Sequence, residues 1–574
     1  MKEGMQLSDL QELFLNFETI KLEGCRVVYL NKTLADGKSS EAILEAYSYA
    51  VSSDSTPPLG QSSVKTFMAE RYGGDGILSN GGGGRCGFDG VWQLKGLGPN
   101  QLVGKDVDAD HGDGNLSLDT AIYESIWSEI INAALPFGAI RTVAVLDSGR
   151  SFEERGISTP RGLLVRQPVV RPAHFIRAIY FKEQQFDRLS EDALRVKAVI
   201  VKLIDFLPGT GVATTTSNMS DRLRLGLFEL AARFAEQFAA AKAKHIIHYN
   251  VSASNLSLDG AWLDLSGTRL FTKLIGIDQV DIDRFNLEHF PAVQSLQSLC
   301  YYLGKYSVIS AEDSVHILDK TTKHFAKIYN EQLSLYQVAQ AGFPLWILRL
   351  TMGSPELSKF SRNLGKVLAL NDFTVNQITS EGGWNGYERW TARLFSELLL
   401  SRVNASATNL SWLKADATVI NKLLSSYRQL FILASKIANE QNVNLQNFNR
   451  CVLINLTRLN RSHSVLHDLK IEIERIRINT SGDEMVAYKA LSDEATLAAT
   501  LNLGNEQGRS VPFWLSRTLS IWFDPASGMF TLQEADSRSL SIESLLELSE
   551  QRPNITIALS FYRNDWNNIN ETKI

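Results

Sequence analysis

The stretch that decides the fold of this chain is His248-Tyr-Asn-Val-Ser-Ala-Ser-Asn255, which is followed by Asp264 in Trp-Leu-Asp-Leu-Ser-Gly. Asn255 and Asp264 are nine residues apart, on either side of a predicted short hairpin. An amide oxygen and a carboxylate are ligands that magnesium accepts, with phosphate and water oxygens completing its shell. The stretch therefore predicts half of a metal and nucleotide site. The structural alternative is that Asn255 is a turn residue and Asp264 caps a strand. His248 could be a ligand or a base, but we expect a buried histidine that braces the loop.

A glycine-rich segment upstream predicts a loop that binds phosphate. Residues 73–87 hold the densest glycines of the chain, and Arg85 directly follows the run 81–84. Because they have no side chains, Gly82 and Gly84 could bring backbone N–H groups close to phosphate oxygens. The guanidinium of Arg85 could share the negative charge. The structural alternative is a flexible hairpin tip.

Two charged side chains follow this segment at positions that suit a nucleotide site. Lys95 ends a short alternating strand, 91–95, after the turn signal Phe-Asp-Gly. Residues 118–135 predict a helix with Ser117 as its cap. Glu124 on this helix could pair with Lys95, which could in turn reach phosphates, as in kinases. Taken singly, each of the two is more often a solvated surface charge.

The order of the predicted elements indicates the fold class. Further strands are expected at 142–146 and 162–166, and the sequence becomes helical from about residue 186. Later segments such as 417–440 and 462–476 also predict helices, and a hairpin is expected around 523–530. A glycine loop, a lysine strand, an acidic helix and a helical part follow one another in protein kinases. We therefore predict an α+β, protein-kinase-like bilobal fold with an additional, mostly helical C-terminal region.

The predicted fold divides the chain into three parts, because 574 residues are too many for one core. An N-lobe, 1–185, carries the glycine-rich loop, the lysine strand and the acidic helix. A helical C-lobe, 186–400, carries the metal-binding loop. The remainder, 401–574, is a helical or mixed extension whose role the sequence does not define.

Composition narrows the class of protein. The chain is 44% hydrophobic and 21% charged with a net charge of -5, which argues against bulk binding of nucleic acid. Its four cysteines are scattered, without zinc-ligand spacing, as expected of reduced thiols in the cytoplasm. The first residues lack the apolar core of a signal peptide, and no apolar segment is long enough to enter a membrane.

Seven short motifs follow one another along the chain. They are Tyr72-Gly-Gly74, Gly82-Gly-Gly-Arg85, Val91-Trp-Gln-Leu-Lys-Gly96, Gly112-Asp-Gly-Asn115, Ile122-Tyr-Glu-Ser-Ile-Trp-Ser-Glu129, Arg171-Pro-Ala-His-Phe175 and His248 to Asp264. In this order they resemble motifs of the selenoprotein O family, which read roughly YGG, GDGR, LQLKG, GDGRA, IREYLxSE, RFGHF and HGVMNTDN…DYG. The resemblance covers about residues 70–300, and none is traced after residue 310.

The resemblance implies a kinase fold that binds ATP in a flipped orientation and a pseudokinase that transfers AMP to Ser, Thr or Tyr hydroxyls. The acceptor would be a protein or a peptide, and the cofactors would be ATP and Mg²⁺ or Mn²⁺. Residues that would contact the nucleotide are Gly82, Gly84, Arg85, Lys95, Asp113, Gly114, Arg166 and Arg171. Lys95, paired with Glu124, would hold the phosphates, and Asn255 and Asp264 would bind the metal.

The chain departs from the family pattern at the position of the catalytic base. Ser254 stands where the family has the Asp that precedes the metal-binding Asn. A serine hydroxyl does not take up a proton at neutral pH, and general-base help is worth ~10²–10⁴ in rate. Asp259 could substitute if its side chain pointed inward. The second arginine of GDGR is Asn115 here, and the glycine of DYG is missing after Asp264.

Two functions from different classes follow. The first is an ATP- and magnesium-dependent adenylyltransferase, in which Lys95, Glu124 and Asp264 are catalytic. The second is a catalytically degenerate nucleotide-binding scaffold that assists another enzyme, for example in peptide maturation, with a partner subunit on the C-terminal extension. Retention of the charged residues and of Asn255 favours the first, whereas Ser254 and the extension favour the second.

Overall fold

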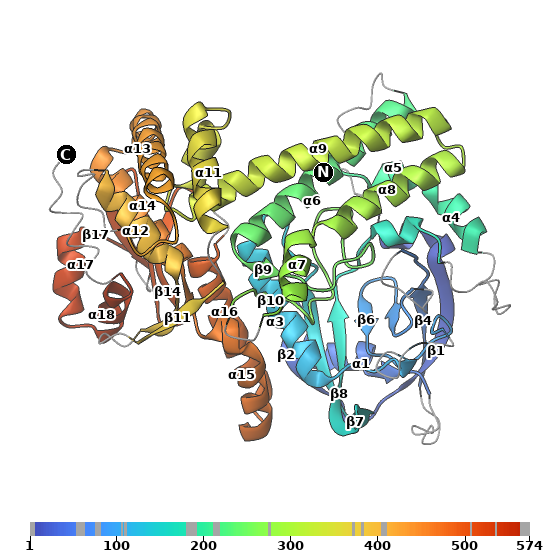
Figure 1. Cartoon of the computed structure of the whole chain (residues 1–574). Helices are drawn as coiled ribbons and strands as arrows, with labels where there is room; N and C mark the ends of the chain where they lie inside the picture. Colours follow the sequence, from blue (N-terminus) through green and yellow to red (C-terminus); the bar gives the residue numbers. More distant parts are fainter. Residues whose placement is uncertain are drawn as a thin grey trace.

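The structure is a computed structural model of the whole chain (Figure 1). It describes residues 6–52, 63–74, 82–104, 107, 112–178, 192–209, 218–273, 277–369, 373–379, 384–402, 410–480, 482–504, 508–533 and 537–562. Residues 75–81 of the glycine-rich segment and His111 therefore lie outside the described residues.

An antiparallel eight-stranded sheet forms the first part of the described chain, with the strand order β2-β7-β8-β6-β5-β4-β1-β3. Its strands are β1 (Phe14–Lys21), β2 (Arg26–Leu30), β3 (Tyr49–Ala50), β4 (Val64–Glu70), β5 (Cys86–Phe88), β6 (Gln93–Lys95), β7 (Thr142–Glu154) and β8 (Ile157–Arg166). The short helix α1 (Ser40–Tyr47) precedes β3. The predicted lysine strand and the two later strands are confirmed. β6 pairs with both β5 and β8, which places Lys95 in the interior of the sheet.

The ribbon of β7 and β8 has a local cause. Glu154 pairs with Ile157, so Arg155 and Gly156 alone form the turn. Both turn residues have positive φ, 52° and 78°. Such a two-residue turn matches the right-handed twist of the strands that it joins.

The predicted acidic helix is confirmed as α3 (Leu118–Ala134). The hydroxyl of Ser117 caps it by accepting a hydrogen bond from the Thr120 backbone N–H. Its inner side chains, such as Ile122, Ile126 and Ile130, are fully buried. α3 packs on β7 and β8, and this contact fixes Glu124 against the sheet.

Helices dominate the middle of the chain, as expected. They are α4 (Asp192–Ile200), α5 (Leu203–Phe206), α6 (Met219–Ala243), α7 (Gln279–Leu287), α8 (Phe290–Lys305), α9 (Ala311–Ala339), α10 (Leu345–Leu350) and α11 (Pro355–Leu368). The long helices α6 and α9 pack side by side (Figure 1). Between α6 and α7 lie the short strands β9 (Ile246–Ile247) and β10 (Arg269–Leu270), which pair and so close the loop that contains residues 248–268. Short 3₁₀ turns lie at Leu7–Asp9, Gln11–Leu13 and Pro172–Phe175.

One part of the chain expected to be helical is a sheet. β11 (Val375–Thr379) and β12 (Asn385–Arg389) pair with each other, and β13 (Arg461–His463) joins β12 from far along the chain. The helix expected from residue 462 therefore begins only at Val465. The expectation failed because these strands are short and β13 joins β12 from far along the chain, so local periodicity does not reveal the sheet.

The C-terminal region mixes helices and a four-stranded sheet. Its elements are α12 (Trp390–Ser401), α13 (Ala417–Glu440), α14 (Leu445–Leu459), α15 (Val465–Asn479), α16 (Glu484–Asn502), β14 (Val511–Ser516), β15 (Leu519–Asp524), β16 (Met529–Gln533), β17 (Arg538–Leu540), α17 (Ile542–Ser549) and α18 (Pro553–Ser560). The expected helix 417–440 and the hairpin joining β15 and β16 are both confirmed.

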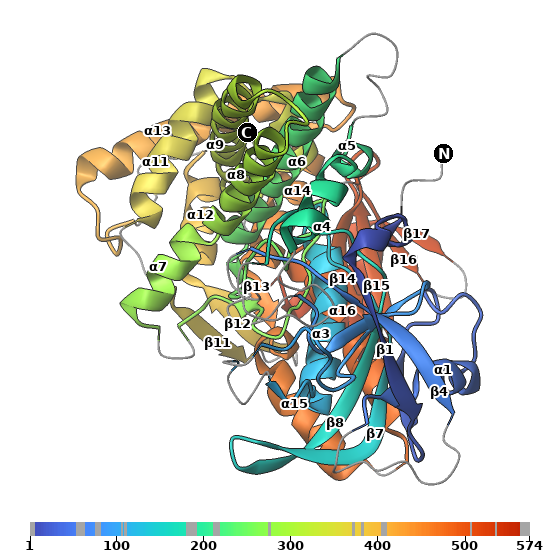
Figure 2. The same ribbon diagram turned by 90° about the vertical axis from the view of Figure 1, so that its right-hand side faces the viewer.

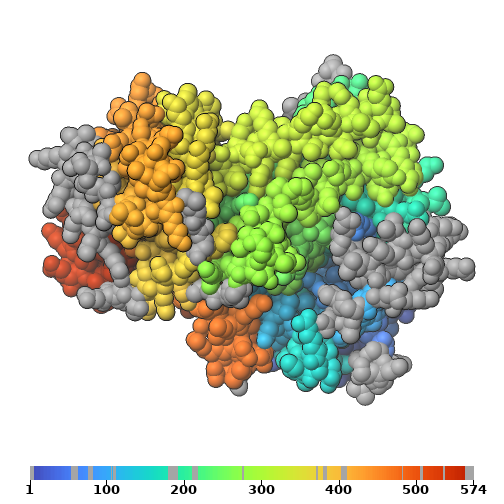
Figure 3. Space-filling view, viewed as in Figure 1, coloured from blue at the N-terminus to red at the C-terminus, as the bar shows by residue number. Residues whose placement is uncertain are grey.

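This region is not a separate appendage. One cluster of buried hydrophobic residues extends from Leu7 to Tyr562. In the space-filling view, the orange surface of the C-terminal helices meets the blue and cyan surface of the first part (Figure 3). No helix within the described ranges is long and apolar enough to cross a membrane.

Candidate functional site

A cavity of about 540 Å³ lies between the glycine-rich end of the sheet and the loop that precedes β10. It gathers most of the residues that the sequence analysis singled out. Its lining consists of Tyr72, Gly82, Gly83, Gly84, Arg85, Cys86, Lys95, Asn250, Val251, Ser252, Ser254, Asn255, Asp264 and Ser266. Asp264 is the one acidic side chain in this described lining.

Lys95 is held between two carboxylates. Its Nζ lies 2.7 Å from Glu124 Oε1 and 2.8 Å from Asp264 Oδ1. Lys95 and Glu124 are almost fully buried, with exposed fractions of 3% and 4%. The sheet supplies the lysine, α3 supplies the glutamate and the loop before β10 supplies the aspartate. The structure thus brings together three residues that are far apart in the sequence.

Asp264 is the centre of a cluster of positive charges. Arg166 Nη1 lies 2.7 Å from Asp264 Oδ1, and Arg171 Nη1 lies 3.8 Å from Oδ2. Burial alone would raise the pKa of Asp264, but Arg166, then Lys95 and Arg171 hold that pKa well below its usual value. The carboxylate is therefore ionised throughout the neutral range. The backbone of Asp264 has a φ of 58°, a conformation that Asp tolerates better than most residues.

The two arginines lie behind the cavity rather than in its lining. Arg166 Nε donates to Gln93 Oε1 at 3.1 Å. Arg171 Nη1 donates to the Ser254 backbone oxygen at 2.9 Å, and its guanidinium stacks over the Tyr72 ring at 5.0 Å. Arg171 is 1% exposed. Its hydrogen bond to Ser254 holds the loop in place, and its charge adds to the positive cluster around Asp264.

Sequence reasoning missed the support beneath these arginines. Gln93 Nε2 donates to Glu70 Oε1 at 2.5 Å, and His174 Nε2 lies 3.0 Å from Glu70 Oε2. Burial opposes ionisation of Glu70, but its hydrogen bond to His174 and the charge of Arg171 lower its pKa below the ordinary value. Glu70 and Gln93 lie in strands whose sequences look like ordinary core, so no local signal marks them.

The glycine segment does not have the arrangement that the sequence analysis expected. The Gly83 N–H donates to the Glu70 backbone oxygen at 3.0 Å, and the Gly84 N–H donates to Gly82 oxygen at 2.9 Å. These two N–H groups are therefore already used within the backbone. A Cβ at Gly82, whose φ is 131°, would lie 2.2 Å from the Glu70 oxygen, so close packing requires this glycine. Gly82 and Gly84 still form a wall of the cavity.

Asp113 and Gly114 do not belong to the described lining of the cavity. Asp113 instead accepts hydrogen bonds from the N–H and the side-chain amide of Asn115, at 2.9 and 2.8 Å. A Cβ at Gly114 would lie 2.1 Å from the Gly98 carbonyl carbon, so this glycine is needed for packing. Arg85 reaches the same turn, because its Nη1 donates to the Asn115 backbone oxygen at 3.2 Å.

The loop before β10 presents polar groups to the cavity. The Asn255 side-chain NH₂ donates to the backbone oxygen of Asn250 at 2.7 Å, and this bond orients the amide. Among the described residues, Asn255 Oδ1 accepts one long hydrogen bond, from the Ser254 hydroxyl at 3.4 Å. The hydroxyls of Ser254 and Ser252 lie 2.8 Å apart. Asp259 is exposed and lies outside the described lining, so it does not replace the missing base.

His248 braces this loop. It is fully buried, its Nε2 lies 2.9 Å from the Leu263 backbone oxygen, and its ring packs edge-on against Trp262. Burial lowers the pKa of His248 to about 4, so the ring is neutral at pH 7. The bracing interpretation of His248 is therefore confirmed.

A metal ion fits this site only together with anions. The described residues contain no group of three or more His, Cys, Asp or Glu side chains that could hold a metal. Magnesium bound with a nucleotide needs only one or two protein ligands, and the oxygens of Asn255 and Asp264 both belong to the cavity. Because Asp264 already contacts Lys95 and Arg166, incoming phosphates would have to attract those two cations first.

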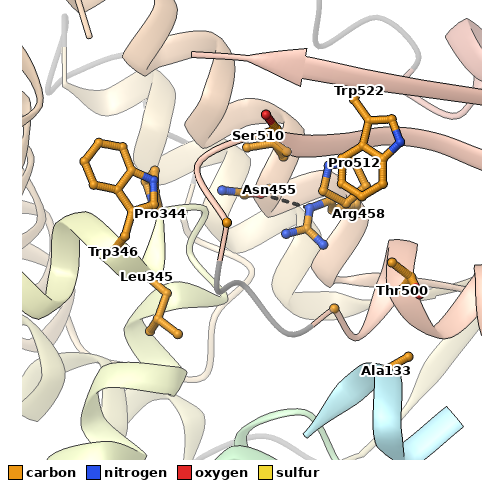
Figure 4. A pocket seen from close by; sticks show the side chains of 13 residues that line it. Ala133, Pro344, Leu345, Trp346, Asn455, Arg458, Thr500, Ser510, Pro512 and Trp522 are labelled. Atoms are coloured by element: carbon orange, nitrogen blue, oxygen red, sulfur yellow. Dashed lines mark hydrogen bonds between the residues drawn. The ribbon is translucent and has the colours of Figure 1, made fainter. Parts of the chain in front are cut away.

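A second cavity, of about 260 Å³, lies among α10, α14, α16, β14 and β15 (Figure 4). Trp346, Pro512 and Trp522 give it a largely apolar wall, and the Arg458 guanidinium points toward its middle. None of the predicted site residues belongs to its described lining.

The chain matches no protein-family model, and a search of curated proteins found no match either.

Proposed function

We propose that this chain has a kinase-like, selenoprotein O-type bilobal fold and is an ATP- and magnesium-dependent adenylyltransferase. One observation carries the proposal. A buried lysine bridges a helix glutamate and a loop aspartate at 2.7 and 2.8 Å, at the edge of a 540 Å³ cavity that also contains Arg85 and Asn255. A buried lysine and a half-buried arginine, in a described lining with a single acidic side chain, suit a polyphosphate.

The proposed reaction transfers AMP to a hydroxyl of a protein or peptide. The acceptor oxygen attacks the α-phosphorus, the bond from that phosphorus to the bridging oxygen of the β-phosphate breaks, and pyrophosphate leaves. Mg²⁺ or Mn²⁺ on Asn255 and Asp264 would supply charge neutralisation at the phosphates. Lys95 and Arg85 would stabilise the charge that builds on the leaving group, which is the main source of catalysis in such transfers.

Proton removal is the weakest step of this reaction. The described lining holds no carboxylate other than Asp264, whose low pKa makes it a poor base. The hydroxyl proton would pass through Ser254 and Ser252, which lie 2.8 Å apart, to the departing pyrophosphate or to solvent. We expect slow transfer rather than none, because general-base help supplies only ~10²–10⁴ of the rate.

The alternative is a nucleotide-binding scaffold without catalysis, and Ser254 favours it. None of the four cysteines forms a disulfide in the structure, which is compatible with the proposed cytoplasmic location. The test is incubation with candidate acceptors and Mg²⁺ or Mn²⁺ and with ATP labelled at either the α- or the γ-phosphate. The adenylyltransferase predicts protein-bound label from the α-phosphate only, and none with Asp264→Ala. Label from the γ-phosphate alone would indicate a kinase, and binding without transfer would support the scaffold.

A further inference from the structure

The helix that carries Glu124 has protein on both of its faces. β7 and β8 cover one side of α3, and α15 and α16 of the C-terminal region cover another. The two ribbon views agree in placing α3 beside α15 and α16 (Figure 1, Figure 2). The position of Glu124 therefore depends on elements more than 300 residues away in the sequence.

A single hydrogen bond ties α3 to the segment that follows Asp264. The Tyr123 hydroxyl donates to the Thr268 backbone oxygen at 2.6 Å. Tyr123 is adjacent to Glu124, and Thr268 is four residues after Asp264. Because Glu124 and Asp264 both bind Lys95, this bond joins the two elements that hold the lysine.

α15 packs on both α3 and the strand that follows Thr268. The ammonium of Lys470 lies 5.1 Å from the centroid of the Tyr123 ring. Arg477 Nε donates to both carboxylate oxygens of Asp119, in the first turn of α3, at 3.0 and 3.1 Å. The same helix packs on β10, which begins directly after Thr268. One helix thus contacts Tyr123 and the strand that begins directly after Thr268.

We propose that α15 acts as a brace, which holds α3 and the segment 264–270 together around Lys95. Tyr123, Lys470 and Arg477 are its positioning residues. The consequence for nucleotide binding rests on the proposed function, whereas the bracing itself does not. The brace gives the C-terminal region a role at the site although it contributes no residue to the described lining of the cavity.

The ion pair at the far end of the brace is partly buried. Burial raises the pKa of Asp119 above its ordinary value, although Arg477 offsets part of this rise. A carboxylate in the first turn also interacts favourably with the helix dipole. Without Arg477 the carboxylate would lose its partner, and the start of α3 would be held less firmly.

The test compares Arg477→Gln with Arg475→Gln in the full-length chain. Arg475 lies on the same helix, but its Nη1 pairs with Glu472 of that helix at 3.1 Å and its side chain is 62% exposed. Both substitutions remove one positive charge from α15. Hydrogen exchange of peptides covering 118–134 and 264–270 is measured for each, together with the midpoint of thermal unfolding and the affinity for ATP with Mg²⁺.

The brace predicts that Arg477→Gln speeds exchange in 118–134 by about two- to fivefold, the range expected for a partly exposed ion pair, while Arg475→Gln leaves it unchanged. Arg477→Lys should restore slow exchange. Tyr123→Phe keeps the ring beneath Lys470 and should speed exchange in 264–270. Equal exchange in both glutamine variants, or unchanged exchange in 264–270 with Tyr123→Phe, would overturn the brace.

Binding of ATP separates the two proposals. If the wild type binds ATP, the braced arrangement predicts weaker affinity in Tyr123→Phe and Arg477→Gln, and unchanged affinity in Arg475→Gln. If the wild type binds no ATP, the proposed function fails, and the exchange rates alone still support or overturn the brace.

Discussion

At the scale of single residues, Lys95 is the most sensitive position. Replacing it by Met leaves the buried Glu124 carboxylate without its 2.7 Å partner, although Asp264 keeps Arg166. We expect Lys95→Met to lower the free energy of unfolding by ~3–5 kcal/mol, the cost typical of breaking a buried pair. Urea unfolding of the variant and the wild type measures this loss.

A double variant tests whether the pair is the cause. Glu124→Gln added to Lys95→Met removes the unpaired charge and should recover part of the stability. Lys65→Met is a matched control, because Lys65 pairs with Asp89 at 2.9 Å but is 25% exposed, and it should cost much less. Strictly additive losses in the double variant would contradict the coupling.

Glu288 predicts a pH dependence of stability. This buried carboxyl accepts a hydrogen bond from the Tyr249 N–H at 2.7 Å, and burial raises its pKa from 4.5 to about 8. Between those values the folded state binds a proton that the unfolded state lacks, so stability decreases as the pH rises through this window. Urea unfolding should show the wild type losing stability relative to Glu288→Gln between pH 5 and about 8. Parallel curves for the two proteins would contradict this assignment.

Several site residues were predictable because their chemistry is local. The spacing of Asn255 and Asp264, the alternation before Lys95 and the helical pattern around Glu124 are all visible in short windows. The roles of Gly82 and Gly114 were not, because each is set by the approach of a remote backbone.

At the scale of elements, α3 is the helix on which the site depends most. Its cap is Ser117, whose hydroxyl accepts from the Thr120 N–H at 3.3 Å. Ser117→Ala should lower the free energy of unfolding by about 1 kcal/mol, as is typical of a lost cap, and Ser117→Thr should lower it less. Chemical unfolding measures both variants, and equal losses would show that the cap is not the cause.

α3 and the hairpin joining β15 and β16 were predictable from periodicity and turn residues. The sheet of β11, β12 and β13 was not. Gly386 of β12 pairs with His463 of β13, and a Cβ at Gly386 would lie 2.5 Å from the backbone oxygen of Ser462. Such contacts between distant segments leave no local pattern, so the sequence around 385–389 gave no reason to expect a strand.

At the scale of the whole molecule, the C-terminal region shares a core with the sheet and the helices before it. Changes in sequence pattern predict three parts, but they do not reveal that α15 and α16 pack against α3. More than 300 residues separate α3 from α15 and α16, so no local periodicity in the sequence predicts their contact.

The balance of charge around Asp264 predicts that metal and nucleotide bind together. Lys95 and Arg166 already neutralise the carboxylate, so Mn²⁺ alone should bind weakly. Bound ATP would draw those cations to its phosphates, so we expect Mn²⁺ affinity to rise by ~5–150-fold, the usual range of coupling between ligands. Electron paramagnetic resonance of free Mn²⁺ measures this directly, with Asp264→Asn as the control. Equal Mn²⁺ affinity with and without ATP, after correction for the complex in solution, would contradict the prediction.

We propose that the cavity lined by Lys95 and Asp264 binds the phosphates of ATP. A crystal structure with a non-hydrolysable ATP analogue and Mg²⁺ would test this. We expect phosphates in contact with Lys95 and Arg85, and a metal ion between Asn255 and Asp264. A saturated crystal with the analogue bound elsewhere, or with Lys95 still bonded only to Glu124 and Asp264, would contradict it.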